Sequence, residues 1–315
     1  MNSLPDTVPV AVLCGSDSAE RAVSLVTGHA IAVALKEEGL AVELFDLPGC
    51  ALPESLDPAR QVVFPALHGG WGENGGVQAE LESHGFAYAG CNAEASRLCM
   101  DKVETKRVLA AAGLPVLPHV IFTDDKPSSA SSLMTKLGPA IILKPIAEGS
   151  SVGLHRAANR PDLAAALTQL TPGNWMAEPW VRGPEVSVGV LAGRALGVVE
   201  IRPMGGASYD FAHKYQPGMT EYFFPAPLDA ALTEKIQAAA AGAFAACGCR
   251  DFARVDFMLP PAGGYVILEI NTMPGCTPTS LLPKSASCCG YTFPKLIRAM
   301  LGPALERFAA VAATP

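Results

Sequence analysis

The 315 residues comprise 50% hydrophobic and 17% charged side chains, with a net charge of −7 and a pI near 5.4. This length allows two or three compact units with substantial cores. Lys and Arg are scattered, which argues against nucleic acid as the main partner because duplex binding depends on clustered basic side chains. No stretch reaches the roughly 20 apolar residues that span a bilayer, so we expect no membrane partner.

The N-terminus lacks the basic and apolar segments of a signal peptide, so we expect a cytoplasmic protein. Nine cysteines agree with a reducing cytosol, where free thiols act as small buried side chains. Cys247-x-Cys249 and Cys288-Cys289 do not have the spacing of a zinc knuckle, and we do not interpret them as metal ligands.

Hydrophobic patterning predicts elements in this order: strand 8–13, helix 19–38, strands 41–45 and 61–67, helix 77–83, helix 93–112, extended 116–122, strand 140–144, helix 160–170, strand 175–178, hairpin 185–191 with 195–201, helix 228–247, a second hairpin and terminal helices. Strands that alternate with helices indicate a parallel sheet in the first 90 residues. Residues 204–219 show no clean period and are typical of a mobile lid.

The second hairpin, residues 254–275, has the most informative pattern in the chain. Folding about its Pro/Gly-rich turn places Asp256 opposite Glu269 and Arg254 opposite Asn271, all on one face. Two opposed carboxylates repel, and Mg²⁺ (or Mn²⁺) held by Asp256, Glu269 and Asn271 would remove that penalty. The alternative is a solvated face that carries charge. The core face is expected to carry Val255, Phe257, Leu268 and Ile270.

Two glycine-rich motifs match other chemistries without their structural context. Gly70-x-Gly72-x-x-Gly75 matches a dinucleotide fingerprint but does not lie at a first βα turn. Gly149-x-Ser151-x-Gly153 matches a hydrolase nucleophile elbow, but the residues that follow read as extended rather than helical. We therefore interpret the first as a loop approached closely by a small ligand and the second as a phosphate cradle.

Lysines and glutamates elsewhere indicate a nucleotide-triphosphate site. Lys102 begins a helix, Lys144 ends an apolar strand and Lys214 lies in the lid-like segment; each alone would be interpreted as a solvated lysine. Together with the serine loop and the acidic hairpin they supply charges for phosphates. We expect Glu178 to accept from adenine or ribose, and Glu185 from ribose hydroxyls.

Short motifs occur in order from about Val10 to Leu296: Gly15-x-x-Ser18-Ala19-Glu20-Arg21-x-Val23-Ser24, Ala66-Leu67-His68-Gly69, Met100-Asp101-Lys102, Lys144-Pro145-x-x-Glu148-Gly149-Ser150-Ser151-Val152-Gly153, Gly183-Pro184-Glu185, Lys214-Tyr215, Arg254-x-Asp256 and Glu269-x-Asn271-Thr272-x-Pro274-Gly275. In this the chain resembles the D-alanine–D-alanine ligases of the ATP-grasp superfamily. The resemblance implies an α/β fold (α+β overall) in three domains: a Rossmann-like parallel sheet in 1–92, and two α+β domains, 93–182 and 183–315, that clasp ATP beneath a lid at 203–219.

The resemblance also implies an activity: a homodimeric, ATP-dependent ligase that joins two D-alanine molecules through an acyl phosphate for peptidoglycan synthesis. Glu20 would pair with the ammonium group of the first D-alanine, and Ser150 and Tyr215 would join Glu20 in a hydrogen-bonded triad. Arg254 and the backbone N–H of Gly275 would form the oxyanion site, leaving the opposed acids to the metal. The remaining D-alanine subsites would be lined by Val23, His68, Ser280 and Leu281. ATP would be held by Lys102, Lys144, Ser150, Ser151, Glu178, Trp180, Val181, Glu185 and Lys214.

Three residues depart from the family pattern. Trp71 adds a bulky aromatic near the first subsite, Asn74 removes a carboxylate, and Cys276 replaces a more usual Met or Leu. D-serine therefore stays open as the second substrate, as does a related ligase that uses another amino acid. A nucleotide-binding protein without activity is the rival from another class, but the intact catalytic residues argue against it. A serine hydrolase is the remote third alternative.

Overall fold

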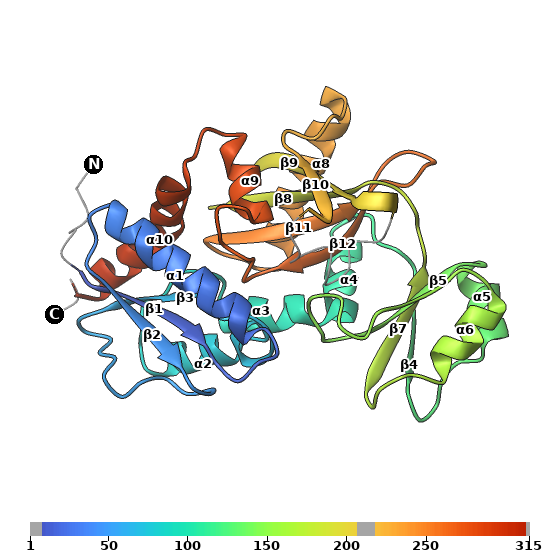
Figure 1. Ribbon diagram of the computed structural model, residues 1–315, viewed down its shortest axis with the longest axis horizontal. Coiled ribbons are helices and arrows are strands. Elements are labelled where there is room, and N and C mark those ends of the chain that lie inside the picture. The colour runs from blue at the N-terminus through green and yellow to red at the C-terminus, as the bar shows by residue number, and fades with distance from the viewer. Residues whose placement is uncertain (1–7, 207–217, 313–315) are drawn as a thin grey trace.

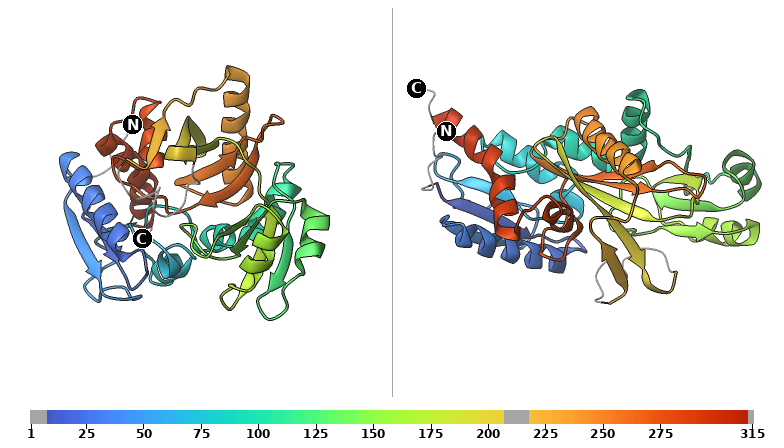
Figure 2. Two further views of the ribbon diagram at one scale, coloured as in Figure 1. Left: turned by 45° about the vertical axis from the view of Figure 1, so that its right-hand side comes forward. Right: turned by 90° about the horizontal axis from the view of Figure 1, so that it is seen from above.

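The computed structural model describes residues 8–206 and 218–312, so the lid residues Lys214 and Tyr215 lie outside the described part of the chain. Three sheets form along the chain (Figure 1), and Figure 2 shows the same arrangement from two further directions. The predicted fold class is confirmed, because one parallel sheet is followed by two antiparallel sheets with helices packed against each.

The first sheet has the strand order β2-β1-β3. Its parallel strands are β1 Val10–Gly15, β2 Val42–Leu47 and β3 Val62–Pro65. Alternate residues of β1 enter two different cores, as the pleat requires. Val10 and Val12 pack under α1 Arg21–Glu37 and α10 Phe293–Ala312, whereas Ala11 and Leu13 pack against α2 Gly76–Ser83. Both faces are therefore covered.

The second sheet is antiparallel, in the order β4-β7-β5-β6, and consists of β4 Val120–Thr123, β5 Ile141–Pro145, β6 His155–Ala157 and β7 Asn174–Pro179. Leucines from two helices cover one of its faces. The two helices are α5 Ala130–Leu137 and α6 Arg160–Leu167. The β5–β6 connection contains the serine loop. It projects from the end of this sheet toward the first sheet and its helices (Figure 1).

The third sheet has the order β10-β9-β8-β11-β12, and its strands are β8 Glu185–Leu191, β9 Arg194–Pro203, β10 Thr220–Phe223, β11 Phe252–Met258 and β12 Val266–Asn271. Helix α8 Ala230–Ala246 packs on it. Helix α9 Leu281–Ser287 packs against β8 and β9. The Cβ-free backbone of Gly189 allows this approach, since a Cβ there would lie 2.4 Å from Leu282 Cδ1.

Packing crosses the predicted domain limits, which stay a prediction. The C-terminal helix α10 packs against α1 and β3 of the first sheet. Helices α3 Ala93–Met100 and α4 Lys102–Ala111 contact β12, and α4 also contacts α8. The Asp251 carboxylate accepts from the Gly90 backbone and from Arg307 Nη1, both at 2.9 Å. This partly buried ion pair and the Gly90 hydrogen bond tie the first sheet and α10 to the start of β11.

The predicted helix 93–112 is divided at Asp101. The Asp101 side chain accepts from Val103 N and Glu104 N at 2.9 and 3.0 Å, which makes it the N-cap of a second helix. Lys102 thus begins α4, and its backbone N–H donates to Ile146 O at 3.1 Å. The cap and this bond orient Lys102 toward the β5–β6 connection.

The register of the predicted β11–β12 hairpin is confirmed at its functional end, where Arg254 pairs with Asn271 and Asp256 with Glu269. Beyond Asp256 the register shifts, as in a β-bulge, and Phe257 lies opposite Ile267. The expected core position of Leu268 is therefore wrong. Ile267 is buried in the core, and Leu268 is partly exposed and faces a cavity.

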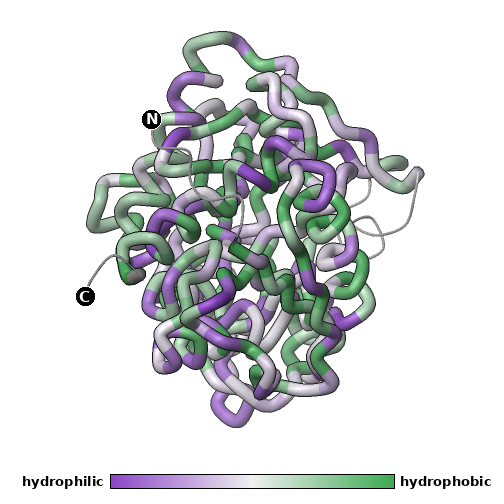
Figure 3. The backbone as a smooth tube through the Cα atoms, turned by 90° about the vertical axis from the view of Figure 1, so that its left-hand side faces the viewer, coloured by the Kyte–Doolittle hydropathy of each residue, from purple (hydrophilic) through white to green (hydrophobic). Residues whose placement is uncertain are grey.

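No helix in the described part of the chain is long and apolar enough to cross a membrane. Hydrophobic and hydrophilic stretches alternate along the coloured part of the backbone (Figure 3).

Candidate functional site

Two adjoining cavities lie where the three sheets meet. The first, of about 530 Å³, lies between α1, the serine loop, the β11–β12 hairpin and the start of α9; the second, of about 460 Å³, lies between the second and third sheets. They share Lys102, Glu148 and Glu269. Every predicted site residue in residues 8–206 and 218–312 lines one or both of them. The first contains Glu20, Val23, His68, Ser150, Arg254, Asn271, Gly275, Ser280 and Leu281, and the second contains Lys144, Ser151, Glu178, Trp180, Val181, Glu185 and Asp256.

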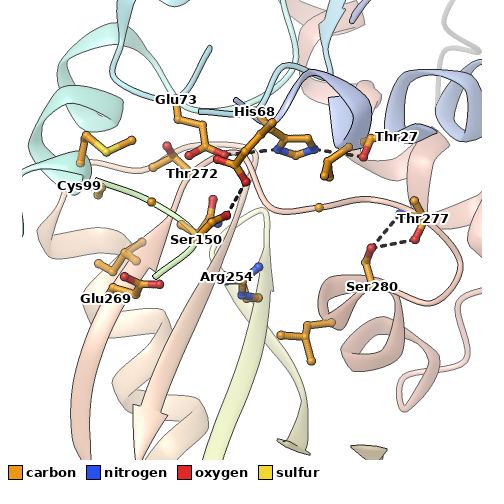
Figure 4. Close-up of a pocket in the computed structure, with 18 of the residues that line it drawn as sticks. Thr27, His68, Glu73, Cys99, Ser150, Arg254, Glu269, Thr272, Thr277 and Ser280 are labelled. Carbon is orange, nitrogen blue, oxygen red and sulfur yellow. Dashed lines mark hydrogen bonds and ion pairs between the residues drawn. The ribbon is translucent and has the colours of Figure 1, made fainter. Parts of the chain in front are cut away.

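Glu20 and Ser150 meet across the first cavity. Glu20 immediately precedes α1, and its carboxylate accepts a hydrogen bond from Ser150 Oγ (Figure 4). A carboxylate beside the N-terminus of a helix is favoured by the helix dipole. The Glu20 backbone N–H donates to Ser18 Oγ at 3.2 Å, and Ser18 Oγ donates to His68 O at 2.6 Å. The third member of the predicted triad, Tyr215, lies outside the described residues.

His68 is buried and is held from both sides. Its Nδ1 lies 3.3 Å from Glu73 Oε1, and its Nε2 lies 3.1 Å from Thr27 Oγ1, as Figure 4 shows. Glu73 also lines the first cavity, and sequence reasoning had assigned it no role. A Cβ on Gly149 would be 3.4 Å from Glu73 Oε2 and 3.8 Å from Glu20 Oε2, so both carboxylates face the serine loop.

The serine loop has an unusual backbone. Ser150 and Ser151 have φ values of 49° and 59°, in the left-handed region that non-glycine residues rarely adopt. Such strain clusters at ligand sites, where successive backbone N–H groups can turn toward one anion. Ser150 faces the first cavity and Ser151 the second, and Lys102 Nζ donates to Glu148 O beside them. This geometry suits a phosphate cradle.

The hairpin face holds its charges in a way that the sequence did not predict. Arg254 Nη2 and Nε donate to Asp256 at 2.7 and 2.9 Å, so Arg254 does neutralise one of the acids. This corrects the expectation that Arg254 serves only an oxyanion. Asp256 also accepts from Ser187 Oγ at 2.7 Å, because β8 places Ser187 directly opposite it. No motif pointed to Ser187, since the contact depends on the pairing of strands distant in the sequence.

The start of α9 closes the first cavity opposite Glu20. Ser280 precedes α9, and its Oγ accepts from Thr277 N at 3.0 Å. A Cβ on Gly275 would lie 3.5 Å from Ser280 Oγ, so the Gly275 backbone is next to this hydroxyl. In Figure 4, Arg254 lies between Glu269 and Ser280. The arginine and the Gly275 amide therefore line the same cavity, as an oxyanion site requires.

A group of charges lies at the wall of the second cavity, and Lys144 and Glu178 line it. Glu178 forms ion pairs with Lys144 and with Lys106, and the side chains of Lys106 and Glu178 are each 3% exposed. Burial alone would raise the pKa of the Glu178 carboxyl, but the two ammonium groups together hold that pKa below its usual value. Burial lowers the pKa of both Lys102 and Lys106. Sequence reasoning missed Lys106, which reads as one more polar residue on a helix.

The β11–β12 hairpin carries the candidate ligands for a divalent cation, which are Asp256, Glu269 and Asn271. Asp256 and Glu269 face one another across the hairpin and line the second cavity, and Asn271 lines the first. Among the described residues no three His, Cys, Asp or Glu side chains are grouped to hold a metal. Two carboxylates and an amide oxygen suit Mg²⁺ when phosphate oxygens supply further ligands.

The three departures from the family pattern line neither cavity. Trp71 packs against the core between the first sheet and α2, Asn74 Oδ1 accepts from Gly76 N at 3.0 Å, and Cys276 is buried. The expectation that Trp71 lies near the first subsite is not supported. Local packing also requires Gly72, because a Cβ there would be 2.5 Å from Leu67 Cβ.

The structural context of the hydrolase elbow is absent. The serine loop joins strand β5 to strand β6, and the elbow requires a helix after its serine.

Comparisons with known proteins agree with this geometry. The family described as D-ala D-ala ligase C-terminus matches residues 108–302. A D-alanine–D-alanine ligase of Anaeromyxobacter sp. (strain Fw109-5) is 42% identical over 94% of this chain and 97% of its own length. The chain belongs to the D-alanine–D-alanine ligase family.

Other members of the family extend the likeness. The D-alanine–D-alanine ligase of Acinetobacter baumannii (strain AYE) is 39% identical over 94% of this chain and 96% of its own. A crystal structure of the Bacillus anthracis ligase complexed with ATP has a TM-score of 0.84 at 27% identity and covers 97% of this chain and 100% of that one. The VanG D-Ala:D-Ser ligase of Enterococcus faecalis has a TM-score of 0.82 at 26% identity and covers 95% of this chain and 99% of that one. The fold is thus shared by ligases with different second substrates.

Proposed function

We propose that this protein is an ATP-dependent ligase that joins two D-alanine molecules into D-alanyl-D-alanine for peptidoglycan synthesis. One observation carries the proposal: a cavity lined by lysines adjoins a cavity lined by Glu20, Arg254 and Ser280, and the two share Lys102 and Glu269. A reaction that transfers the γ-phosphate of ATP to a small carboxylate needs its two substrates in adjoining spaces.

The proposed reaction, which the family resemblance implies, has two steps. The carboxylate of the first D-alanine attacks the γ-phosphate of ATP. ADP is the leaving group, and the product is an acyl phosphate. The amine of the second D-alanine then attacks the acyl carbon, and inorganic phosphate departs as the dipeptide forms. Glu20 would hold the ammonium group of the first D-alanine, while Arg254 and the Gly275 N–H would stabilise the negative charge that develops on the acyl oxygen.

We propose contacts with ATP for residues on each side of the second cavity. Lys102 and Lys144 would contact phosphate oxygens, and the loop of Ser150 and Ser151 would offer backbone N–H groups. Glu178 and Glu185 would accept from the adenine amino group and the ribose hydroxyls. Trp180 and Val181 would pack against the base. Lys214, outside the described residues, is proposed as a further phosphate contact.

We also propose Asp256, Glu269 and Asn271 as the residues that hold Mg²⁺. When bound, Mg²⁺ would offset the negative charge that accumulates during phosphoryl transfer. Arg254 and Ser187 orient Asp256 in advance, so this carboxylate is kept in place beside Glu269. A cytoplasmic location and a homodimer complete the proposal; size-exclusion chromatography with light scattering tests the dimer.

The substrate assignment is tested by phosphate release from ATP with single and paired D- and L-amino acids. Release with D-alanine alone supports the proposal. Release only with D-alanine plus D-serine would move the protein to a D-Ala:D-Ser specificity, and release only with another pair would overturn the substrate assignment. Ester hydrolysis without ATP would support the serine hydrolase instead.

A further inference from the structure

Lys106 is a buried cation that the proposed chemistry does not use. It lies on α4, one helical turn after Lys102, and its side chain is 3% exposed. Lys102 and Lys144 line the second cavity, whereas Lys106 is not among its lining residues. The Lys106 ammonium instead contacts Glu178 and donates to Leu117 O at 3.3 Å. It therefore meets ATP only through Glu178.

Glu178 is held on both sides, one carboxylate oxygen by Lys106 and the other by Lys144. Lys144 cannot serve Glu178 alone if it also contacts the triphosphate. As Lys144 turns toward phosphate oxygens, the buried Glu178 carboxylate loses part of its charge compensation. A buried charge that loses its partner is strongly destabilising, so a second and permanent partner is needed.

We propose that Lys106 is a positioning residue for ATP binding: it is the permanent counter-ion that keeps the buried Glu178 carboxylate ionised and oriented toward the base while Lys144 engages the phosphates. This inference rests on the proposed function, because it takes ATP as the occupant of the second cavity. It gives the two lysines beside Glu178 different roles. Lys144, which lines the cavity, contacts the ligand, and Lys106 compensates the charge of Glu178.

A double-mutant cycle tests the assignment, with Lys106→Met, Glu178→Gln and the double variant. Binding of a non-hydrolysable ATP analogue is measured by calorimetry, together with kcat and KM for ATP and thermal unfolding of each variant. We expect K106M to weaken analogue binding and raise KM for ATP by about tenfold or more, with kcat changed by less than about threefold. In the E178Q variant, the K106M substitution should weaken analogue binding by less than about twofold, because the carboxylate that Lys106 compensates is gone.

Two further variants serve as controls. Lys106→Arg retains the positive charge and should recover most of the affinity. Arg107→Met removes a charge from the next position of the same helix, where the side chain is exposed, and should leave ATP binding unchanged.

Equal losses from K106M in the wild-type protein and in the E178Q variant would overturn the proposal, as would wild-type analogue binding by K106M. A loss of kcat and of folding without a change in analogue affinity would reduce Lys106 to a structural role and also overturn it. Failure of the wild-type protein to bind the analogue is a different result, because it would reject the proposed function itself.

Discussion

The first and second cavities share Lys102, Glu148 and Glu269 but hold their polar groups in different ways. In the first cavity, side chains from distant elements meet through hydrogen bonds, as Glu20 does with Ser150 and His68 with Thr27. In the second, a buried carboxylate is clamped between two ammonium groups. The hydrogen bonds in the first cavity can orient small reacting groups. The fixed charges at the second cavity can bind a polyanion. We expect substitutions in the two cavities to affect different steps.

The largest effect is expected at Arg254, which lines the first cavity while its partner Asp256 lines the second. Arg254→Ala should lower the rate of dipeptide formation by about a thousandfold, because an oxyanion donor is lost. Binding of an ATP analogue should stay measurable by calorimetry. Turnover near the wild-type rate would show that the oxyanion role is wrong.

A substitution at Glu20 should separate the cavities. Glu20→Gln removes the charge proposed to pair with the first D-alanine, and should raise the KM for D-alanine by about tenfold to a hundredfold while the KM for ATP changes by less than about twofold. Initial rates with each substrate varied in turn give both constants. Ser150→Ala is the matched control, because it removes the hydrogen bond to Glu20 but leaves the charge. If E20Q raised the KM for D-alanine and the KM for ATP to the same extent, the proposed separation of the two cavities would be wrong.

Ser187, which is buried behind Asp256, offers a smaller test of the proposed metal site. Ser187→Ala removes the hydroxyl that donates to Asp256 at 2.7 Å. The Mg²⁺ concentration for half-maximal activity should rise by about fivefold, since a hydrogen bond to a charged group is lost. The KM for D-alanine at saturating Mg²⁺ should not change. A magnesium requirement identical to that of the wild type would remove Ser187 from the proposed metal site.

The pH dependence of stability should report on the clamp around Glu178. Because the Glu178 pKa is lowered in the folded protein, its carboxylate stabilises the fold above the unfolded pKa, and this contribution is lost as the pH falls through the folded pKa. The unfolding temperature of the wild type should exceed that of Glu178→Gln at pH 7 by about 2 °C or more. The difference should shrink at about pH 3.5, where carboxyl groups become protonated. A difference independent of pH would contradict the clamp.

The smallest effect is expected at Trp71, which packs on the core between the first sheet and α2 and lines neither cavity. Trp71→Phe should change kcat and both KM values by less than about twofold, because surface and peripheral packing changes are mild when no site group moves. The same kinetic assays check this. A clear change in preference between D-alanine and D-serine would show that Trp71 contributes to substrate specificity.

Local patterns in the sequence were sufficient for the hairpin that carries Arg254 and Asp256. Antiparallel pairing about a short turn aligns neighbouring residues by counting alone, so the register to Asn271 and Glu269 could be predicted. The family motifs likewise contained Lys102 and Lys144, and the pattern of charged residues singled out Glu178; all three line the second cavity. The roles assigned to them stay predictions.

Only the tertiary structure decided which groups surround these residues. Ser187 meets Asp256 because β8 and β11 pair in the third sheet, and Lys106 meets Glu178 because α4 packs beside the second sheet. The bulge after Asp256 exchanged Leu268 for Ile267 in the core, since one extra residue reverses the side-chain alternation. Contacts between distant segments depend on how whole elements pack, and no spacing within one segment encodes them.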